Sequence, residues 1–398
     1  MLELALFLIV APLQIPAYSL LLLTLAAKKV SKKTHVSGLD RPRVAIIVPA
    51  HNESVHVLPT IACLLPQLNA TDILLLVADN CSDDTAQVAR QAGATVVERY
   101  DTKNRGKGYA LDYGLKALSA DPPEVVMVID ADCIVSDKTL DVMTRAAIAS
   151  QRPVQMLNLM QAAPDAGLRH RLLEFAMLVK NKVRPMGSQW LGNACHLMGT
   201  GMAFPWQVIA SLPLATGHIA EDMKLGIETA VRGKPAILDT RVQVSSRFPV
   251  HEKDAQAQKN RWEHGHLATM TELLPQLMRA VVKQKSWPLF VLMLDLMIPP
   301  LTLYSVVLVV TSFFIGLACM WQPQSFGLAA MTMTMACMAL ALSVFIAWWQ
   351  HARTLISMRE LMQIPFYVLW KMPIYLAYFV GKRAGWVRAH RTSDHKDN

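Results

Sequence analysis

Cysteine is scarce in this sequence, and the positions of the few that occur exclude a zinc site of the usual kind. The 398 residues include six scattered cysteines: Cys63, Cys81, Cys133, Cys195, Cys319 and Cys337. No two of them form a Cys-x-x-Cys pair, and no cysteine–histidine cluster has the spacing of zinc ligands. We therefore expect reduced thiols, most of them buried.

Charged residues are also few, at 17% of the chain against 53% hydrophobic residues. They crowd between about residue 28 and residue 285, with long uncharged stretches outside, so the composition predicts a soluble core joined to membrane helices. The formal net charge is +9. However, no basic stripe is interleaved with aromatic residues, which argues against nucleic acid as a partner. Basic residues instead adjoin apolar runs, as in cytoplasmic segments beside anionic lipid.

The first apolar run, Leu2 to Ala27, is expected to be a retained membrane anchor. It lacks a basic region before it and a small-residue cleavage site after it, which a signal peptide would have. Its basic flank, from Lys28 to Lys33, lies on the C-terminal side. The N-terminus is therefore expected outside the membrane and the following domain in the cytoplasm.

More apolar runs follow Trp262. In the first, Leu289 to Ala318, Pro299 and Pro300 interrupt the pattern. Its early part is therefore expected along the interface, and the part after Pro299 is expected to cross. The next run, Phe326 to Trp349, is expected to return inward, since the loop before it carries no Lys or Arg.

The last apolar run, Ile364 to Val380, is ambiguous. Arg353 and Arg359 precede it, and the basic tail from Lys382 follows it. If both flanks are cytoplasmic, the run does not cross. We expect three crossings plus an interfacial or re-entrant helix, with four crossings as the alternative.

Between residues 43 and 163 the chain alternates short β-rich apolar runs with helix-like stretches, which predicts an α/β fold with a parallel sheet. The expected strands are Val44 to Val48, Ile73 to Ala78, Thr95 to Glu98, Val125 to Ile129 and Val154 to Met160. The expected helices are Val55 to Leu68, Asp84 to Ala92, Gly108 to Leu118 and Lys138 to Ser150. In such sheets the ligand lies at the carboxyl ends of the strands, and polar clusters follow those ends here.

Two polar clusters follow the first two strands. Asn52 and Glu53 end the segment PAHNE, and Asp79 begins the polar part of ADNCSDD. At neighbouring strand ends they would form a slot that hydrogen-bonds a base and a ribose. Taken alone, either segment would be read as turn chemistry and helix capping.

The next clusters suit a metal-bound diphosphate. Lys107, in NRGKG, can meet a phosphate where glycines allow close approach. Asp130 and Asp132 follow a buried strand at i and i+2, and two such carboxylates repel unless a cation lies near them. Mg²⁺ or Mn²⁺ binds through one or two carboxylates plus substrate phosphates.

The last clusters suit group transfer. Glu221 and Asp222 open a helix, where acidic residues complement the helix dipole, but Asp222 would also suit a base for an acceptor hydroxyl. Gln258, Arg261 and Trp262 share one face of a later helix. Arginine there can clamp a diphosphate, and tryptophan offers a flat surface to a sugar ring; a pair at the membrane interface is the structural alternative.

The ordered series PAHNE, ADNCSDD, RGKG, DAD, GTG, ED and QKNRW resembles membrane-bound glycosyltransferase family 2, the group of the cellulose, hyaluronan and poly-N-acetylglucosamine synthases. The resemblance implies a GT-A (Rossmann-like) nucleotide-sugar domain. It places Asp79 at the nucleoside, Gly199 and Thr200 beside the acceptor, and Asp222 as the base, with Glu221 beside it. It also makes Gln258, Arg261 and Trp262 the QxxRW element.

The expected organisation is an anchor at 1–27, a cytoplasmic catalytic domain at 40–285, transmembrane or interfacial helices at 286–381 and a basic cytoplasmic tail at 382–398. The implied activity is inverting transfer of a sugar from a UDP-sugar to an exopolysaccharide or lipid-linked glycan at a bacterial inner membrane. ADN replaces the family's usual DDG, and the membrane part is short. Single transfer to a glycolipid or polyprenyl-linked oligosaccharide therefore stays open, as do a non-catalytic scaffold or transporter, a regulatory glycosyltransferase, and a partner subunit or oligomer.

Overall fold

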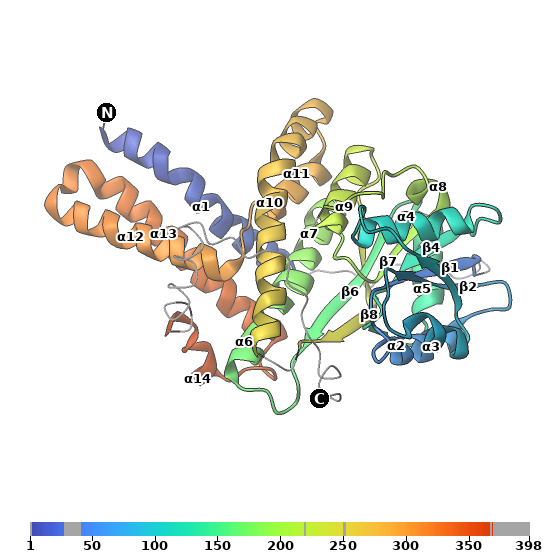
Figure 1. Cartoon of the computed structure of the whole chain (residues 1–398). Helices are drawn as coiled ribbons and strands as arrows, with labels where there is room; N and C mark the ends of the chain where they lie inside the picture. The colour runs from blue at the N-terminus through green and yellow to red at the C-terminus, as the bar shows by residue number, and fades with distance from the viewer. Residues whose placement is uncertain (1, 28–40, 219, 250–251, 367, 369–398) are drawn as a thin grey trace.

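The computed structural model describes residues 2–27, 41–218, 220–249, 252–366 and 368. It consists of a mixed α/β domain and a lobe of long apolar helices, joined by helices that run between them (Figure 1). The α/β core and the helical lobe have separate hydrophobic cores, so each part buries its own apolar residues.

Eight strands form one mixed sheet in the order β3-β2-β1-β4-β7-β6-β8-β5. Their bounds are β1 Val44–Ala50, β2 Ile73–Asp79, β3 Thr95–Arg99, β4 Val125–Val128, β5 Ile134–Val135, β6 Val154–Gln161, β7 Met202–Pro205 and β8 Ile237–Arg247. Strand β1 runs parallel to both β2 and β4, and β2 runs parallel to β3. Strand β7 is antiparallel to β4 and β6. The carboxyl ends of β1, β2 and β4 therefore lie at one edge.

Helices cover both faces of this sheet, because alternate side chains of a strand point to opposite faces. Val44, Ile46 and Val48 of β1 belong to one core, whereas Ala45 and Ile47 belong to the other. The helices of the domain are α2 Val57–Leu64, η2 Leu65–Gln67, α3 Thr85–Gln91, α4 Lys107–Leu118, α5 Thr139–Ser150, α8 Trp206–Ile209 and α9 Glu221–Val231. Helices α2, α3 and α5 contribute to the first core, and α4 and α8 to the second.

The five expected strands and four expected helices are present, with ends shifted by a few residues. The five expected strands all run in the same direction, as the expectation of a parallel sheet requires. The sheet is nevertheless mixed, because β7, which comes after the region 43–163, inserts antiparallel between β4 and β6. Strand β7 is only four residues long and follows two glycines, Gly199 and Gly201, with positive φ. Such a short run carries no period-2 signal of its own.

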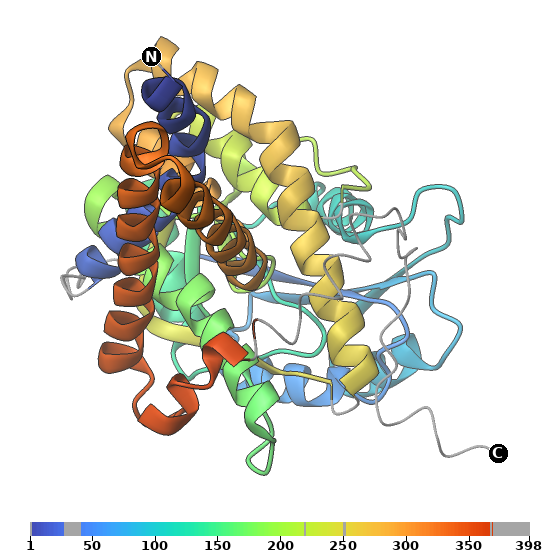
Figure 2. The same cartoon turned by 90° about the vertical axis from the view of Figure 1, so that its left-hand side faces the viewer.

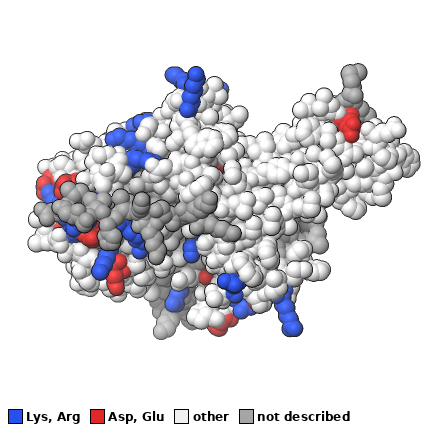
Figure 3. Space-filling model, turned by 180° about the vertical axis from the view of Figure 1, so that it is seen from behind, with Lys and Arg blue, Asp and Glu red and all other residues white. Residues whose placement is uncertain are grey.

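Three helices among the described residues are long and apolar enough to cross a membrane: Glu3–Ala26 of α1, Leu301–Trp321 (α12) and Pro323–His351 (α13). Helix α1 as a whole spans Leu2–Ala26. It packs along α13, which also packs against α12 (Figure 2). The lobe that they form shows almost no charged side chains apart from one acidic patch near its far end (Figure 3).

The remaining helices join the lobe to the sheet. They are α6 Leu168–Leu178, the π-helix η3 Val179–Val183, α7 Arg184–Gly192, α10 Glu252–Gln284, α11 Trp287–Leu296 and α14 Met358–Leu361. Helix α7 crosses α1 so closely that a Cβ on Gly187 would overlap the carbonyl group of Leu23. The long α10 runs between the two parts of the molecule (Figure 1).

Helices α11, α12 and α13 can be compared with the expected membrane crossings. The break at Pro299 and Pro300 is confirmed, because α11 and α12 are separate helices. The turn between α12 and α13 is shorter than expected, since Gln322 alone separates them. The basic flank at 28–33 and the tail at 382–398 lie outside the described residues, as does most of the last apolar run, so three versus four crossings stays a prediction.

Candidate active site

Polar residues gather where β1, β2 and β4 end, at the edge at which parallel sheets bind their ligands. Asn52 follows β1, Asp79 ends β2 and Asp130 follows β4. Asn52 adopts a positive φ of 54°. It links the loop after β1 to the loop after β2, because its side-chain oxygen Oδ1 accepts a hydrogen bond from the Ser82 N–H at 2.7 Å. Glu53 is fixed from the same side, because its N–H donates to the hydroxyl of Thr85 at 2.8 Å. Both residues therefore hold the two loops together.

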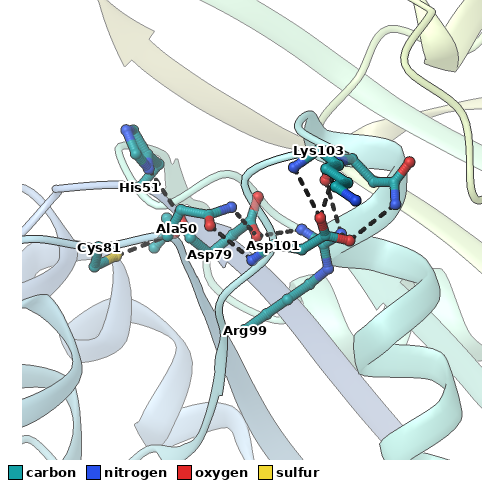
Figure 4. A network of polar contacts seen from close by, with 9 residues as sticks. Ala50, His51, Asp79, Cys81, Arg99, Asp101 and Lys103 are labelled. Carbon is teal, nitrogen blue, oxygen red and sulfur yellow. Dashed lines mark hydrogen bonds and ion pairs between the residues drawn. The ribbon is translucent and has the colours of Figure 1, made fainter.

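Asp79 lies between His51 and Arg99 (Figure 4). Its carbonyl oxygen lies 2.7 Å from His51 Nδ1, and its carboxylate Oδ1 accepts from Arg99 Nη1 at 2.7 Å. The second guanidinium nitrogen of Arg99 donates to Asp101 Oδ2 at 3.0 Å and to the carbonyl group of Asn104 at 2.7 Å. Arg99 thus ties the end of β2 to the loop that leads to Lys107. The sequence interpretation missed it, although its signal was a basic residue ending a strand beside a polar strand end.

Lys107, at the start of α4, connects Asp130, which follows β4, to the residues before β7 and at the start of α9. Its Nζ lies 2.5 Å from Asp130 Oδ1 and 3.8 Å from Glu221 Oε1, and it donates to the Gly199 carbonyl oxygen at 2.8 Å. The next residue, Gly108, allows α4 to pack closely against the segment before α9, because a Cβ on Gly108 would meet the carbonyl oxygen of Leu214 at 2.5 Å. Three segments far apart in the sequence therefore meet at one ammonium group.

The charges at this point are strongly coupled. Burial by itself would lower the pKa of Lys107, but the carboxylates of Asp130 and Glu221 raise it above its ordinary value. Burial raises the pKa of Asp130, against the pull of Lys107 and with the repulsion of Asp132. Burial also raises the pKa of Glu221 to about 7, opposed by Lys107 and helped by the charge of Asp222. Groups with such perturbed pKa values are typical of functional sites.

Asp222 lies against the turn that precedes β7. A Cβ on Gly199 would come within 3.3 Å of Asp222 Oδ2 and within 3.7 Å of Lys107 Nζ. The hydroxyl of the next residue, the buried Thr200, accepts a hydrogen bond from the Asp130 N–H at 3.0 Å. Thr200 therefore orients the segment that carries the two aspartates. The loop before α9 is fixed to α10, because His218 Nε2 lies 3.1 Å from Glu272 Oε2.

Asp130 and Asp132 form the candidate metal group of the described residues, together with Cys133. Ligand atoms of the three residues lie within 4.8 Å of one another. Cys133 was expected only as a buried thiol, and burial with the nearby carboxylates raises its pKa well above the ordinary value. The two carboxylates are half-buried hard oxygen donors that repel each other, so they fit Mg²⁺ or Mn²⁺.

Helix α10 carries the expected QxxRW element. Gln258 is buried, with 8% of its surface exposed, and its Oε1 has no partner among the described residues. Trp262 is half-buried. The side chain of Arg261 lies outside the described part of the chain, so its expected contact with a diphosphate stays a prediction. His266, further along α10, is buried: one ring nitrogen lies 3.0 Å from the Ile298 carbonyl oxygen, and the other has no described partner.

Comparison with known proteins identifies the family. The family model for "glycosyltransferase like family 2" matches residues 42–265, which is more than half of the chain. The chain belongs to this family. The match begins just before β1 and ends within α10, so it includes every cluster described above for this glycosyltransferase. Its membership in the group of the cellulose and hyaluronan synthases stays a prediction.

Solved structures show which fold the glycosyltransferase has. The mannosyltransferase PcManGT from Pyrobaculum calidifontis, solved in complex with GDP-Man and Mn²⁺, is 19% identical, with a TM-score of 0.50. The match covers 88% of this chain and 100% of that one, and at this identity it shows the fold alone.

Glucosyl-3-phosphoglycerate synthase from Mycobacterium tuberculosis, solved with Mn²⁺, UDP and glucosyl-3-phosphoglycerate, is 20% identical over 55% of this chain and 78% of that one, with a TM-score of 0.36. A comparison with curated proteins finds no match.

Proposed function

We propose that this glycosyltransferase transfers a sugar from a UDP-sugar to a growing exopolysaccharide or a lipid-linked glycan, with inversion at the anomeric carbon. One observation supports this most: Lys107 contacts Asp130 on one side and the Gly199 carbonyl oxygen on the other, while Asp222 lies against Gly199. A diphosphate site and a candidate base thereby meet at one point, as a single displacement requires.

On the donor side, Asp79 would bind the nucleoside, and Asp130 with Asp132 would hold Mg²⁺ or Mn²⁺. The cation supplies positive charge where the leaving diphosphate becomes more negative. Lys107 lies at the same position and adds a second positive charge, and Gln258 and Arg261 of α10 would complete the donor contacts.

On the acceptor side, Asp222 would take the proton from the attacking hydroxyl group. The hydroxyl then attacks the anomeric carbon from the face opposite the diphosphate, so a β-linkage follows from an α-linked donor. Glu221, whose pKa is raised to about 7, carries a proton for part of the time near neutral pH. Gly199, Thr200 and Trp262 would line the path of the acceptor.

We propose that the reaction takes place at the cytoplasmic face of a bacterial inner membrane, and the membrane part also bears on the acceptor. Among the described residues, three helices are candidates for crossing. The short membrane part keeps open the alternative of a single transfer to a glycolipid or polyprenyl-linked oligosaccharide, because a wide channel for a polymer would need more helices around it.

The experiment that tests the function supplies membranes containing the protein with a panel of labelled nucleotide sugars and separates lipid-soluble from polymeric product. Asp222→Asn should lower the transfer rate by about 10²–10⁴-fold while donor affinity changes little. Glu228→Gln, on the same helix α9, is the matched control and should transfer normally. Transfer by Asp222→Asn at a near-normal rate would remove Asp222 as the base, and Asp132→Asn should bind the donor poorly in the presence of Mn²⁺.

A further inference from the structure

Arg99 is a buried arginine, with 8% of its surface exposed, at the end of β3. Its two guanidinium nitrogens reach Asp79 Oδ1, Asp101 Oδ2 and the carbonyl oxygen of Asn104. Its charge also lies over the ring of Tyr109, 5.5 Å from the centroid. A buried guanidinium with this many partners has one fixed position, and it fixes the position of each partner in turn.

The two oxygens of the Asp79 carboxylate differ as a result. Oδ1 accepts from Arg99 Nη1 at 2.7 Å and from Asn80 Nδ2 at 2.9 Å, so both of its lone pairs are used. Oδ2 accepts no hydrogen bond from a described residue and is not among the buried atoms without a partner. Asp79 therefore offers one accessible acceptor atom, while its other oxygen is neutralised by a cation (Figure 4).

This asymmetry matters for the nucleobase. The pairing edge of uracil has one N–H group between two carbonyl oxygens, so it donates once, and a second free carboxylate oxygen would repel its carbonyls. Guanine presents two adjacent donors, N1–H and the N2 amino group, which match both oxygens of a free carboxylate. Cytosine has an acceptor, N3, where uracil has its N–H group, so a single carboxylate oxygen that faces this position repels N3, and only the neighbouring 4-amino group can donate to it.

We propose that Arg99 determines base specificity: by occupying Asp79 Oδ1 it leaves one acceptor and selects uracil over guanine. The inference rests on the proposed function, in which Asp79 faces the nucleoside of the donor. Arg99 is a positioning residue in this scheme, because it acts on the base through Asp79.

Competitive binding of UDP, GDP and CDP to the purified full-length protein with Mn²⁺, measured by calorimetry, tests the proposal. UDP should bind at least about tenfold more tightly than GDP, the ratio expected for one hydrogen-bonding group left unpaired. CDP should bind more weakly than UDP. If none of the three nucleotides binds, the proposed function fails; if GDP binds as tightly as UDP while CDP does not, only the role of Arg99 fails.

A variant pair identifies the residue responsible. Arg99→Met keeps an unbranched apolar side chain at this position but removes one of the two hydrogen bonds to Asp79 Oδ1. One lone pair of that oxygen becomes available, so the preference for UDP over GDP should shrink toward unity. Arg90→Met is the matched control, because Arg90 forms an exposed pair with Glu98 at 2.5 Å, and its preference should not change. A folded Arg99→Met protein that keeps the full preference overturns the proposal. If this variant does not fold, the ratio of UDP to GDP affinity in the unaltered protein still tests the proposal, and equal affinities overturn it.

Discussion

The carboxylate of Asp222 lies against the backbone of Gly199, so closely that a Cβ on Gly199 would come within 3.3 Å of Asp222 Oδ2. Gly199 has a φ of +84°, in the region that favours glycine. Its carbonyl oxygen accepts from Lys107 Nζ at 2.8 Å. The turn before β7 therefore sets the distance between the candidate base, Asp222, and the ammonium group of Lys107 at the proposed diphosphate site.

Replacing Gly199 should lower both the transfer rate and the stability, for two different reasons. We expect Gly199→Ala to lower the transfer rate by about tenfold or more, because the methyl group would displace Asp222 and a shift of about 1 Å costs that much. The strain at positive φ should also lower the stability by about 1–2 kcal/mol. Initial rates and the Tm of the purified protein are the measurements.

Gly233→Ala is the control for the strain. Gly233 has a φ of +81°, and a Cβ there would meet nothing within 4 Å. The two variants should lose similar amounts of Tm, and only Gly199→Ala should lose transfer. Equal activity in the two variants would show that Gly199 does not position the base.

Lys107→Met should change metal binding and donor binding in opposite directions. Lys107 Nζ lies 2.5 Å from Asp130 Oδ1, where it repels a divalent cation. Without it, Mn²⁺ alone should bind about tenfold more tightly, while the nucleotide-sugar should bind more weakly because one countercharge of its diphosphate is gone. Titration of Mn²⁺ and of donor by thermal shift measures both.

Lys116→Met is the matched control, since Lys116 lies on the same helix and pairs with Asp112 at the surface. Its Mn²⁺ affinity should equal that of the unaltered protein. Weaker binding of Mn²⁺ alone by Lys107→Met would mean that the lysine supports the metal site and does not compete with it.

Glu221 should make the stability depend on pH. Burial, helped by the charge of Asp222, raises its pKa to about 7 in the folded protein, from an ordinary value of 4.5. The folded state therefore holds this proton more tightly than the unfolded chain does. The stability that Glu221 contributes is complete below about pH 4.5 and is lost as the pH rises to about 7.

Glu221→Gln removes that dependence. Between about pH 5 and pH 8, the Tm of the variant relative to the unaltered protein should rise by about 2–4 °C, measured without metal or donor. Glu228→Gln, further along α9, should show a constant difference over the same range. A Tm difference for Glu221→Gln that falls with pH would contradict the raised pKa.

The sequence predicted what short-range patterns encode. Strands β1, β2 and β4 are continuous apolar runs, and the residues that follow them lie at the expected edge of the sheet. Strands β7 and β8 lie after residue 163, beyond the region in which β-rich apolar runs alternate with helix-like stretches. Strand β8 is held by pairing with β6 across a register shift between Met156 and Leu157, which no local pattern reveals.

The partners within the site could not be predicted, because they are distant in sequence. Nothing near Lys107 indicates that its ammonium group meets Glu221 and the carbonyl group of Gly199. Arg99 looks like an ordinary basic residue at a strand end, yet its contact with Asp79 depends on β2 and β3 lying side by side. Residue types indicated the chemistry, and only the fold shows how charges are paired.

A buried ion pair between Arg184 and Asp295 joins α7 to α11, two of the helices that lie between the apolar lobe and the sheet. Arg184, on α7, has 5% of its surface exposed and Asp295, on α11, has 3%. Arg184 Nε lies 2.7 Å from Asp295 Oδ1, and Nη2 donates to the Asp295 carbonyl oxygen at 2.6 Å. Asp295 lies within the apolar run Leu289 to Ala318, and this pairing explains how a charged residue is tolerated there.

Arg184→Met should therefore lower the stability by about 3–5 kcal/mol, because it leaves the Asp295 carboxylate buried without its countercharge. The double variant Arg184→Met/Asp295→Leu should recover a large part of that loss, since it removes both charges. Arg145→Met, which breaks a more exposed pair with Asp141, should cost about 1 kcal/mol or less. Chemical unfolding of the four proteins in one detergent gives the comparison. An Arg184→Met variant as stable as Arg145→Met would show that the pair does not hold α11 to α7.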